Sequence, residues 1–117
     1  MKHTIALKLN HEFRRLYAKG KNAVAPCMAV YCRPNRLGYT RLGFTVSVKL
    51  GHAVLRNRIR RRLREAYRNN EARFRPGYDI VVVGRVRAGR ARYSDLERQL
   101  LQTADKLGML LPAEPKA

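Results

Sequence analysis

The strongest constraint on the fold is an uninterrupted apolar run, Ile80, Val81, Val82 and Val83. Branched side chains favour extended backbone, and a run without polar alternation is typical of a strand covered on both faces. The chain has 117 residues, which is the length of one domain. We therefore expect residues 80–83 to lie at the centre of a single sheet, in one domain that covers residues 1–117.

Two further strands are predicted by alternation. In residues 27–33 and 41–49, apolar side chains alternate with small or polar ones, which is the pattern of a strand with one buried face. A turn at Pro34 and Asn35 follows the first, so we expect the two strands to pair as a hairpin. The other face is shallow and basic and carries Ala29, Tyr31, Arg33, Gly43, Thr45, Ser47 and Lys49. It is either an ordinary solvated surface or a trough for an extended strand of nucleic acid.

Amphipathic helices are predicted on either side of these strands. The first covers residues 10–19, with Asn10 as its N-cap and Gly20 as its stop. The last follows a capping box of Ser94 and Glu97. With a helix between them, the order is helix, strand, strand, helix, strand, helix, which indicates a small α+β sandwich of helices packed on a sheet.

The middle helix is expected over residues 53–69. Its apolar positions form one stripe: Leu55, Ile59, Leu63, Ala66 and Tyr67. Outside the stripe it carries seven arginines: Arg56, Arg58, Arg60, Arg61, Arg62, Arg64 and Arg68. Like charges four residues apart destabilise a helix by a few tenths of a kcal/mol per pair. We therefore expect a polyanion to bind this helix.

The charge of the whole chain supports this expectation. It contains 26 Lys and Arg against 8 Asp and Glu, for a net charge of +18, and 19 of the basic residues are arginine. No acidic residue occurs between Glu12 and Glu65. Guanidinium groups bind phosphate through paired hydrogen bonds and stack on bases, so arginine favours a nucleic acid over a membrane or an acidic protein.

Other function classes lack their residues. No apolar run is long enough to span a bilayer and the N-terminal sequence lacks the apolar core of a signal peptide, so we expect a cytoplasmic protein without membrane contact. Cys27 and Cys32 are expected to be free thiols on opposite faces of a strand. The histidines His3, His11 and His52 are scattered, without metal-ligand spacing, and the most basic half has no carboxylates for two-metal hydrolysis. We expect neither a catalytic residue nor a metal site on this chain.

A specific motif begins at residue 50, where the sequence reads LGHAVLRNRIRRRLREAY. It resembles the protein subunit of bacterial ribonuclease P, whose Arg-Asn-Arg signature matches Arg56, Asn57 and Arg58. The resemblance extends to about residue 110 and includes further motifs of the family, matched by Asn10, Phe13, Tyr17, Gly20, Tyr31, residues 43–47 and residues 78–83. The tail after about residue 110 has no counterpart, and we expect it to be flexible.

The resemblance implies a fold like the second domain of a small-subunit ribosomal protein, with a left-handed β-α-β crossover through the arginine-rich helix. General packing rules alone would predict the right-handed form. It also implies that a catalytic RNA with bound Mg²⁺ removes the 5′ leader of precursor tRNA by hydrolysing one phosphodiester bond. The protein would then be an RNA-binding subunit of an endoribonuclease and not itself catalytic.

The resemblance also assigns site residues. In a cleft for the single-stranded leader it places Phe13, Tyr17 and Tyr31, with Arg14 and Lys49 near the phosphates. On the surface that binds the catalytic RNA it places Arg56, Asn57, Arg58, Arg60, Arg61, Arg62 and Arg64. Among these residues, Arg62 lies at the edge of the apolar stripe and is expected to be partly structural.

Two departures and two alternatives accompany this interpretation. His52 replaces the asparagine that is common at the helix entrance, and Val48 stands where a lysine is frequent. A ribosomal or RNA-assembly protein of the same fold would share the charge but would have no use for an aromatic trough. A DNA-binding helix-turn-helix regulator is disfavoured, because a recognition helix mixes polar, base-reading residues with its arginines.

Overall fold

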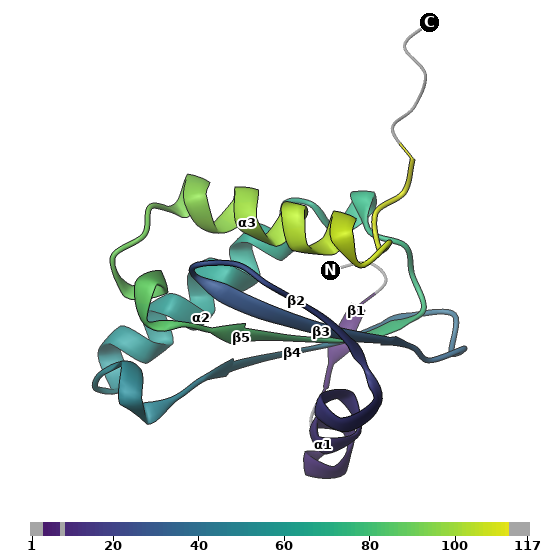
Figure 1. Cartoon of the computed structure of the whole chain (residues 1–117), viewed down its shortest axis with the longest axis horizontal. Coiled ribbons are helices and arrows are strands. Elements are labelled where there is room, and N and C mark those ends of the chain that lie inside the picture. Colours follow the sequence, from purple (N-terminus) through teal and green to yellow (C-terminus); the bar gives the residue numbers. More distant parts are fainter. Residues whose placement is uncertain (1–3, 8, 113–117) are drawn as a thin grey trace, which may run out of the picture.

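The central strand of the sheet is the apolar one. The computed structural model describes residues 4–7 and 9–112, in which five strands form one sheet in the order β1-β4-β5-β3-β2 (Figure 1). Their bounds are β1 Thr4–Ala6, β2 Lys21–Val24, β3 Met28–Pro34, β4 Thr40–Val46 and β5 Tyr78–Gly84. Strand β5 pairs in parallel with β4 and antiparallel with β3, and its Val81 and Val82 are fully buried. The prediction that residues 80–83 form the centre of the sheet is confirmed.

Helices cover the sheet on both faces. The described residues form α1 (Asn10–Lys19), α2 (Ala53–Arg68) and α3 (Tyr93–Lys106), with short 3-10 turns at Val48–Leu50, Glu71–Arg73 and Val86–Gly89. Helices α2 and α3 pack against each other on one face, and α1 lies on the opposite face (Figure 1). This is the predicted α+β sandwich.

Two hydrophobic clusters hold these layers. The larger lies between the sheet and the helix pair, and it includes Ile59 and Leu63 of α2 and Leu96 and Leu100 of α3. The smaller lies beneath α1 and consists of Leu7, Leu16 and Val81, with Phe13, Tyr31 and Val83 packed against it. Because β5 contributes to both clusters, burial on each of its faces explains its unbroken apolar sequence.

The predicted hairpin of residues 27–33 and 41–49 is wrong. Strands β3 and β4 both pair with β5, which lies between them. The hairpin partner of β3 is instead β2, a four-residue strand whose exposed sequence carries no alternation. A fully apolar strand needs a neighbour on both edges to satisfy its backbone, and this requirement outweighs proximity along the chain.

The predicted β-α-β crossover is present. Strands β4 and β5 are parallel neighbours, and α2 connects them. The left-handed sense of this connection stays a prediction from the family resemblance. Strand β1, which the sequence analysis missed, extends the sheet by pairing in parallel with the first half of β4.

Helix α1 begins and ends differently from the prediction. Asn10 is the first helical residue, and Leu9 is the N-cap, with no side chain suited to capping. The carboxylate of Glu12 accepts a hydrogen bond from the Leu9 N–H at 3.3 Å, which stabilises the first turn from inside the helix. Gly20 does end the helix, but at φ −77° it is not left-handed. A Cβ there would lie 2.6 Å from the carbonyl oxygen of Leu16, so close packing requires the glycine.

Helix α3 also lacks its predicted cap. The expected capping box of Ser94 and Glu97 does not form, since the N-cap is Arg92, two residues before Ser94. The Glu97 carboxylate instead accepts a hydrogen bond from Asn70 at 3.0 Å, which joins α3 to the loop after α2. Gly108, at φ 73°, provides the left-handed residue just after the helix.

The C-terminal segment is attached up to the end of the described residues. Leu110 forms an isolated bridge with Phe74, and the Leu111 N–H donates to the Arg73 carbonyl at 2.7 Å. Residues 113–117, which make up most of the tail predicted to be flexible, lie outside the described residues.

We expect Gly20→Ala to lower the free energy of unfolding by about 1–3 kcal/mol, because the new methyl group overlaps the backbone of α1 and of β3. Urea denaturation monitored by circular dichroism measures the change. The neighbouring exposed substitution Lys19→Ala should change stability by less than about 0.5 kcal/mol. Equal stabilities for the two variants would contradict the close packing at Gly20.

Candidate nucleic-acid interface

Helix α2 turns its apolar stripe to the sheet and its arginines to solvent. Ile59, Leu63, Ala66 and Tyr67 are buried, as predicted. The exposed predicted RNA-binding residues are Asn57, Arg58, Arg61 and Arg64. The half-buried ones are Arg56, Arg60 and Arg62. The arginines therefore form a continuous cationic surface along the helix.

Several residues of this surface also contact other groups of the protein. The side-chain oxygen of Asn57 accepts a hydrogen bond from Arg60 Nη1 at 2.9 Å, so the asparagine orients a guanidinium group one turn further along. Arg62 Nη1 donates to the carbonyl of Ala91 at 3.2 Å, which links α2 to the loop before α3. The prediction that Arg62 is partly structural is confirmed. Arg56 Nε is buried and has no hydrogen-bond partner among the described residues.

On the other face of the sheet, beside α1, a row of small and apolar side chains is partly uncovered, and we call this surface the trough. Its floor is one row of side chains across four strands, because Val24 pairs with Ala29, Ala29 with Val83, and Val83 with Thr45. Val24 is 55% exposed and the other three are half-buried. These small and apolar side chains make a smooth surface close to the backbone.

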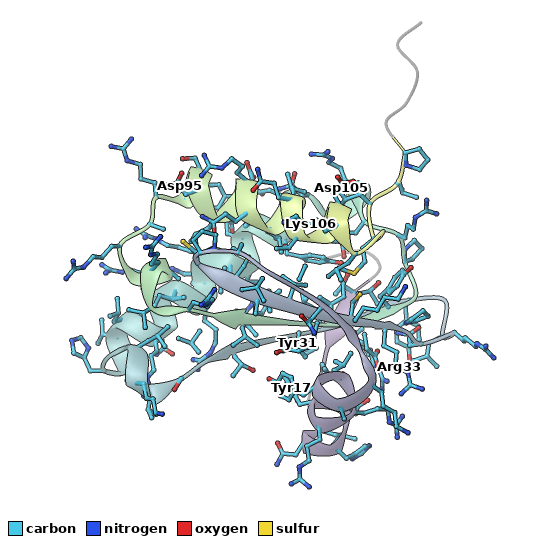
Figure 2. The ribbon with its side chains drawn as sticks, in the orientation of Figure 1. Tyr17, Tyr31, Arg33, Asp95, Asp105 and Lys106 are labelled. Carbon is cyan, nitrogen blue, oxygen red and sulfur yellow. The ribbon has the colours of Figure 1, made fainter. Side chains whose placement is uncertain are left out.

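Aromatic side chains form the wall of this trough. The rings of Tyr17 on α1 and Tyr31 on β3 meet edge to face, with centroids 5.0 Å apart. Tyr17 is 43% exposed, and its hydroxyl lies 3.5 Å from the hydroxyl of Thr45 on the floor. Figure 2 shows the two tyrosines pointing toward each other between α1 and the sheet. The structure therefore brings Tyr17 and Tyr31 together at an open surface.

Phe13 completes the wall toward β4. Its ring lies directly on Gly43, where a Cβ would come within 2.7 Å of the ring. Phe13 is half-buried and packs against the small cluster under α1. The glycine therefore leaves the space beside the strand that the ring occupies.

The two predicted cations of the trough are both exposed. Arg14 follows Phe13 on α1, next to the aromatic wall. The strand predicted to reach Lys49 ends at Val46, so Lys49 lies in the 3-10 turn Val48–Leu50. The strand alternation therefore does not extend to Lys49 and does not place it on the trough floor. The prediction that Val48 faces the core is wrong, because its side chain is 72% exposed.

A cluster of ion pairs anchors α1, and sequence analysis missed it. Arg41 on β4 binds both oxygens of Asp79 on β5, at 2.8 and 2.6 Å, and it also pairs with Glu12 of α1. Its hydrogen bonds to Asp79 raise the pKa of the Arg41 guanidinium above its ordinary value. One signal was available, since Asp79 is the polar residue within the apolar sequence of β5. The cluster fixes the start of α1, and with it the aromatic wall.

The acidic residues of α3 lie away from these surfaces. Figure 2 shows Asp95 and Asp105 on the opposite side of the molecule from Tyr17 and Tyr31. Asp95 also pairs with Arg98 at 3.1 Å. The negative charges of Asp95 and Asp105 are therefore kept away from the trough.

The described residues provide little for other chemistries. Among them, no three His, Cys, Asp or Glu side chains are grouped to hold a metal ion, and no helix has the length and apolarity to cross a membrane. Cys27 and Cys32 are free and buried in the same core, because Cys27 precedes β3 and so escapes its alternation. Burial raises the pKa of the Cys32 thiol to about 11, which keeps it protonated and unreactive.

Comparison with known proteins decides the family. A sequence model described as Ribonuclease P matches residues 1–108. The chain belongs to the ribonuclease P protein family. It is 36% identical over 104 residues to the ribonuclease P protein component of Alkaliphilus metalliredigens, covering 89% of this chain and 94% of the relative. It is 39% identical over 98 residues to that of Clostridioides difficile, covering 83% and 86%.

Solved structures agree with this assignment. The RNase P protein of Staphylococcus aureus matches with a TM-score of 0.82 at 31% identity, over 91% of this chain and 97% of that one. The protein of Thermotoga maritima matches with a TM-score of 0.77 at 31% identity, over 84% and 93%. The chain is thus the protein component of an endoribonuclease that processes tRNA, and its partner is the ribonuclease P RNA. The interpretation as a ribonuclease P subunit is confirmed over that as a ribosomal protein.

Two neighbouring arginines of α2 are expected to have different roles, Arg61 in binding RNA and Arg62 in stabilising the fold. We expect Arg61→Gln, at an exposed position, to reduce the slope of log affinity for the ribonuclease P RNA against log salt by about 0.7–0.9, since one phosphate contact is lost. Arg62→Gln should instead lower the free energy of unfolding by about 1 kcal/mol, because its hydrogen bond to Ala91 is lost. Binding titrations across a salt series and urea denaturation measure both. Identical effects of the two variants would contradict this division.

Proposed function

We propose that the protein binds two different RNA segments within ribonuclease P. The trough of Val24, Ala29, Val83 and Thr45, walled by Tyr17, Tyr31 and Phe13, would hold the single-stranded 5′ leader of precursor tRNA. The arginines of α2 would bind the catalytic RNA. The observation that carries this proposal is the edge-to-face pair of the exposed Tyr17 and the half-buried Tyr31 above a floor of small side chains.

The geometry of the trough favours a single strand. Unpaired nucleotides expose their base faces, and aromatic side chains bind such faces by stacking, largely independently of sequence. A smooth floor lets an extended chain lie close to the sheet. A duplex stacks its bases on each other and presents phosphates instead, which suits the arginines of α2.

We assign the hydrolysis to the catalytic RNA and the Mg²⁺ bound to it. Two-metal hydrolysis requires several carboxylates that converge on the ions. Near the trough, Glu12 and Asp79 are both engaged with Arg41. The described residues therefore do not fit a magnesium site, and the protein contributes binding. Aromatic side chains and arginines on one surface favour RNA over DNA or a membrane as the partner. We place this function in the cytoplasm.

The double substitution Tyr17→Ala with Tyr31→Ala should weaken binding of precursor tRNA to the holoenzyme by about 10- to 100-fold, because base stacking is lost. The loss should grow with leader length up to the length of the trough and vanish for a precursor without a leader. Binding titrations with a series of leader lengths measure this effect.

Tyr39→Ala is a matched control for this experiment. Tyr39 is an exposed tyrosine in the loop before β4, outside the trough. We expect it to leave precursor binding unchanged at every leader length. A loss from the double variant that does not depend on leader length would refute the assignment of the trough to the leader.

Cleavage should require the RNA subunit. We expect the isolated protein to leave precursor tRNA intact. The reconstituted holoenzyme should cleave it at a lower Mg²⁺ concentration than the RNA alone, because the arginines of the protein reduce the repulsion between RNA phosphates. Gel assays across a Mg²⁺ series measure both. Cleavage by the RNA-free protein that is abolished by Asp79→Asn would assign the chemistry to the protein instead.

A further inference from the structure

Within residues 4–7 and 9–112, the pairing of β1 along the outer edge of β4 covers only part of that strand. Strand β1 pairs with β4 only as far as Ala6 opposite Leu42, and the last contact is the Leu7 N–H to the Leu42 carbonyl at 2.9 Å. Beyond it, no described strand pairs with residues 43–46 on that side. A pocket of about 420 Å³ lies at this edge, which we call the edge pocket. Among its lining residues are Ile5, Leu7, Phe13, Phe44, Arg60 and Arg64.

The edge pocket combines aromatic rings with two cations. Phe13 comes from α1 and Phe44 from β4, so rings from two elements line one space. Arg60 and Arg64 of α2 are one turn apart, and the Arg64 guanidinium lies 6.0 Å from the centre of the Phe44 ring. Asn57 holds Arg60 by a hydrogen bond, which limits its rotamers. The described acidic side chains contribute none of the pocket's lining.

This combination fits a single nucleotide. A base stacks on an aromatic ring, a phosphate binds two guanidinium groups, and an open strand edge offers backbone N–H and C=O groups to the polar edge of a base. The pocket also lies between the two proposed RNA surfaces, because Phe13 belongs to the wall of the trough and Arg60 and Arg64 belong to α2.

We propose that the edge pocket binds one unpaired nucleotide of the catalytic RNA, turned out of its strand. Its base would take the place of the Arg64 guanidinium over the Phe44 ring, and its phosphate would bind Arg60 and the displaced Arg64. We assign the nucleotide to the catalytic RNA because both phosphate-binding groups are on α2. The inference rests on the proposed docking of α2 on that RNA.

The test is base-specific chemical footprinting of the catalytic RNA, saturated with either the unsubstituted protein or Phe44→Leu. The unsubstituted protein should protect one unpaired base that becomes reactive again with the variant. The affinity of Phe44→Leu for the RNA should fall about tenfold with an unchanged salt slope, because stacking is lost while the phosphate contacts remain.

A second variant avoids the partly buried Phe44. Ile5 is 52% exposed at the rim of the pocket, so Ile5→Glu should leave the fold intact and repel the phosphate. We expect it to expose the same base as Phe44→Leu. Leu111→Glu is the matched control, since Leu111 is 45% exposed, does not line the pocket and undergoes the same change of charge.

The outcomes separate this inference from the function on which it rests. Protection patterns and affinities that are the same for the unsubstituted protein, Phe44→Leu and Ile5→Glu would overturn the pocket assignment alone. A loss seen only with leader-bearing precursor would place the nucleotide in the leader and also overturn it. Failure of the unsubstituted protein to bind the catalytic RNA would overturn both proposals.

Discussion

The burial of β5 on both faces is the constraint on which the rest of the structure depends. A strand made of Ile80, Val81, Val82 and Val83 must be covered above and below, so the helices divide between the two sides of the sheet. The pair α2 and α3 fills one side. On the other side α1 covers only part of the sheet, and the uncovered part is the trough. The same requirement that builds the core therefore also leaves a surface free for a ligand.

Charge is distributed according to the same division. The chain has a net charge of +18 and only 8 acidic residues, and three of them illustrate where negative charge is placed. Glu12 and Asp79 bind Arg41 and so fix α1, while Asp95 lies on the far side with α3. The self-repulsion of the arginines on α2 is tolerated because Ile59 and Leu63 anchor that helix in the core.

Local pattern predicted the elements better than their pairing. The apolar stripe of α2, the central position of β5 and the stop at Gly20 follow from periods and residue types that act over a few residues. The pairing of β3 with β5 and the Arg41 cluster depend on contacts between residues about 30 to 55 positions apart, which no local period encodes. The aromatic pair of the site was predictable from the family motif, whereas the alternation of residues 41–49 places Phe44 on the buried face of its strand and does not indicate the edge pocket.

The attachment of α1 differs in kind from that of the other helices. It rests on the small cluster around Leu7, Leu16 and Val81 and on the ion pairs of Arg41, and not on the main core. Segments with few buried apolar contacts open at a lower free energy than the whole domain. Two of the three wall residues, Phe13 and Tyr17, thus lie on a layer that opens more easily than the core, so a bound strand would stiffen that layer while the core beneath keeps the rigidity it already has.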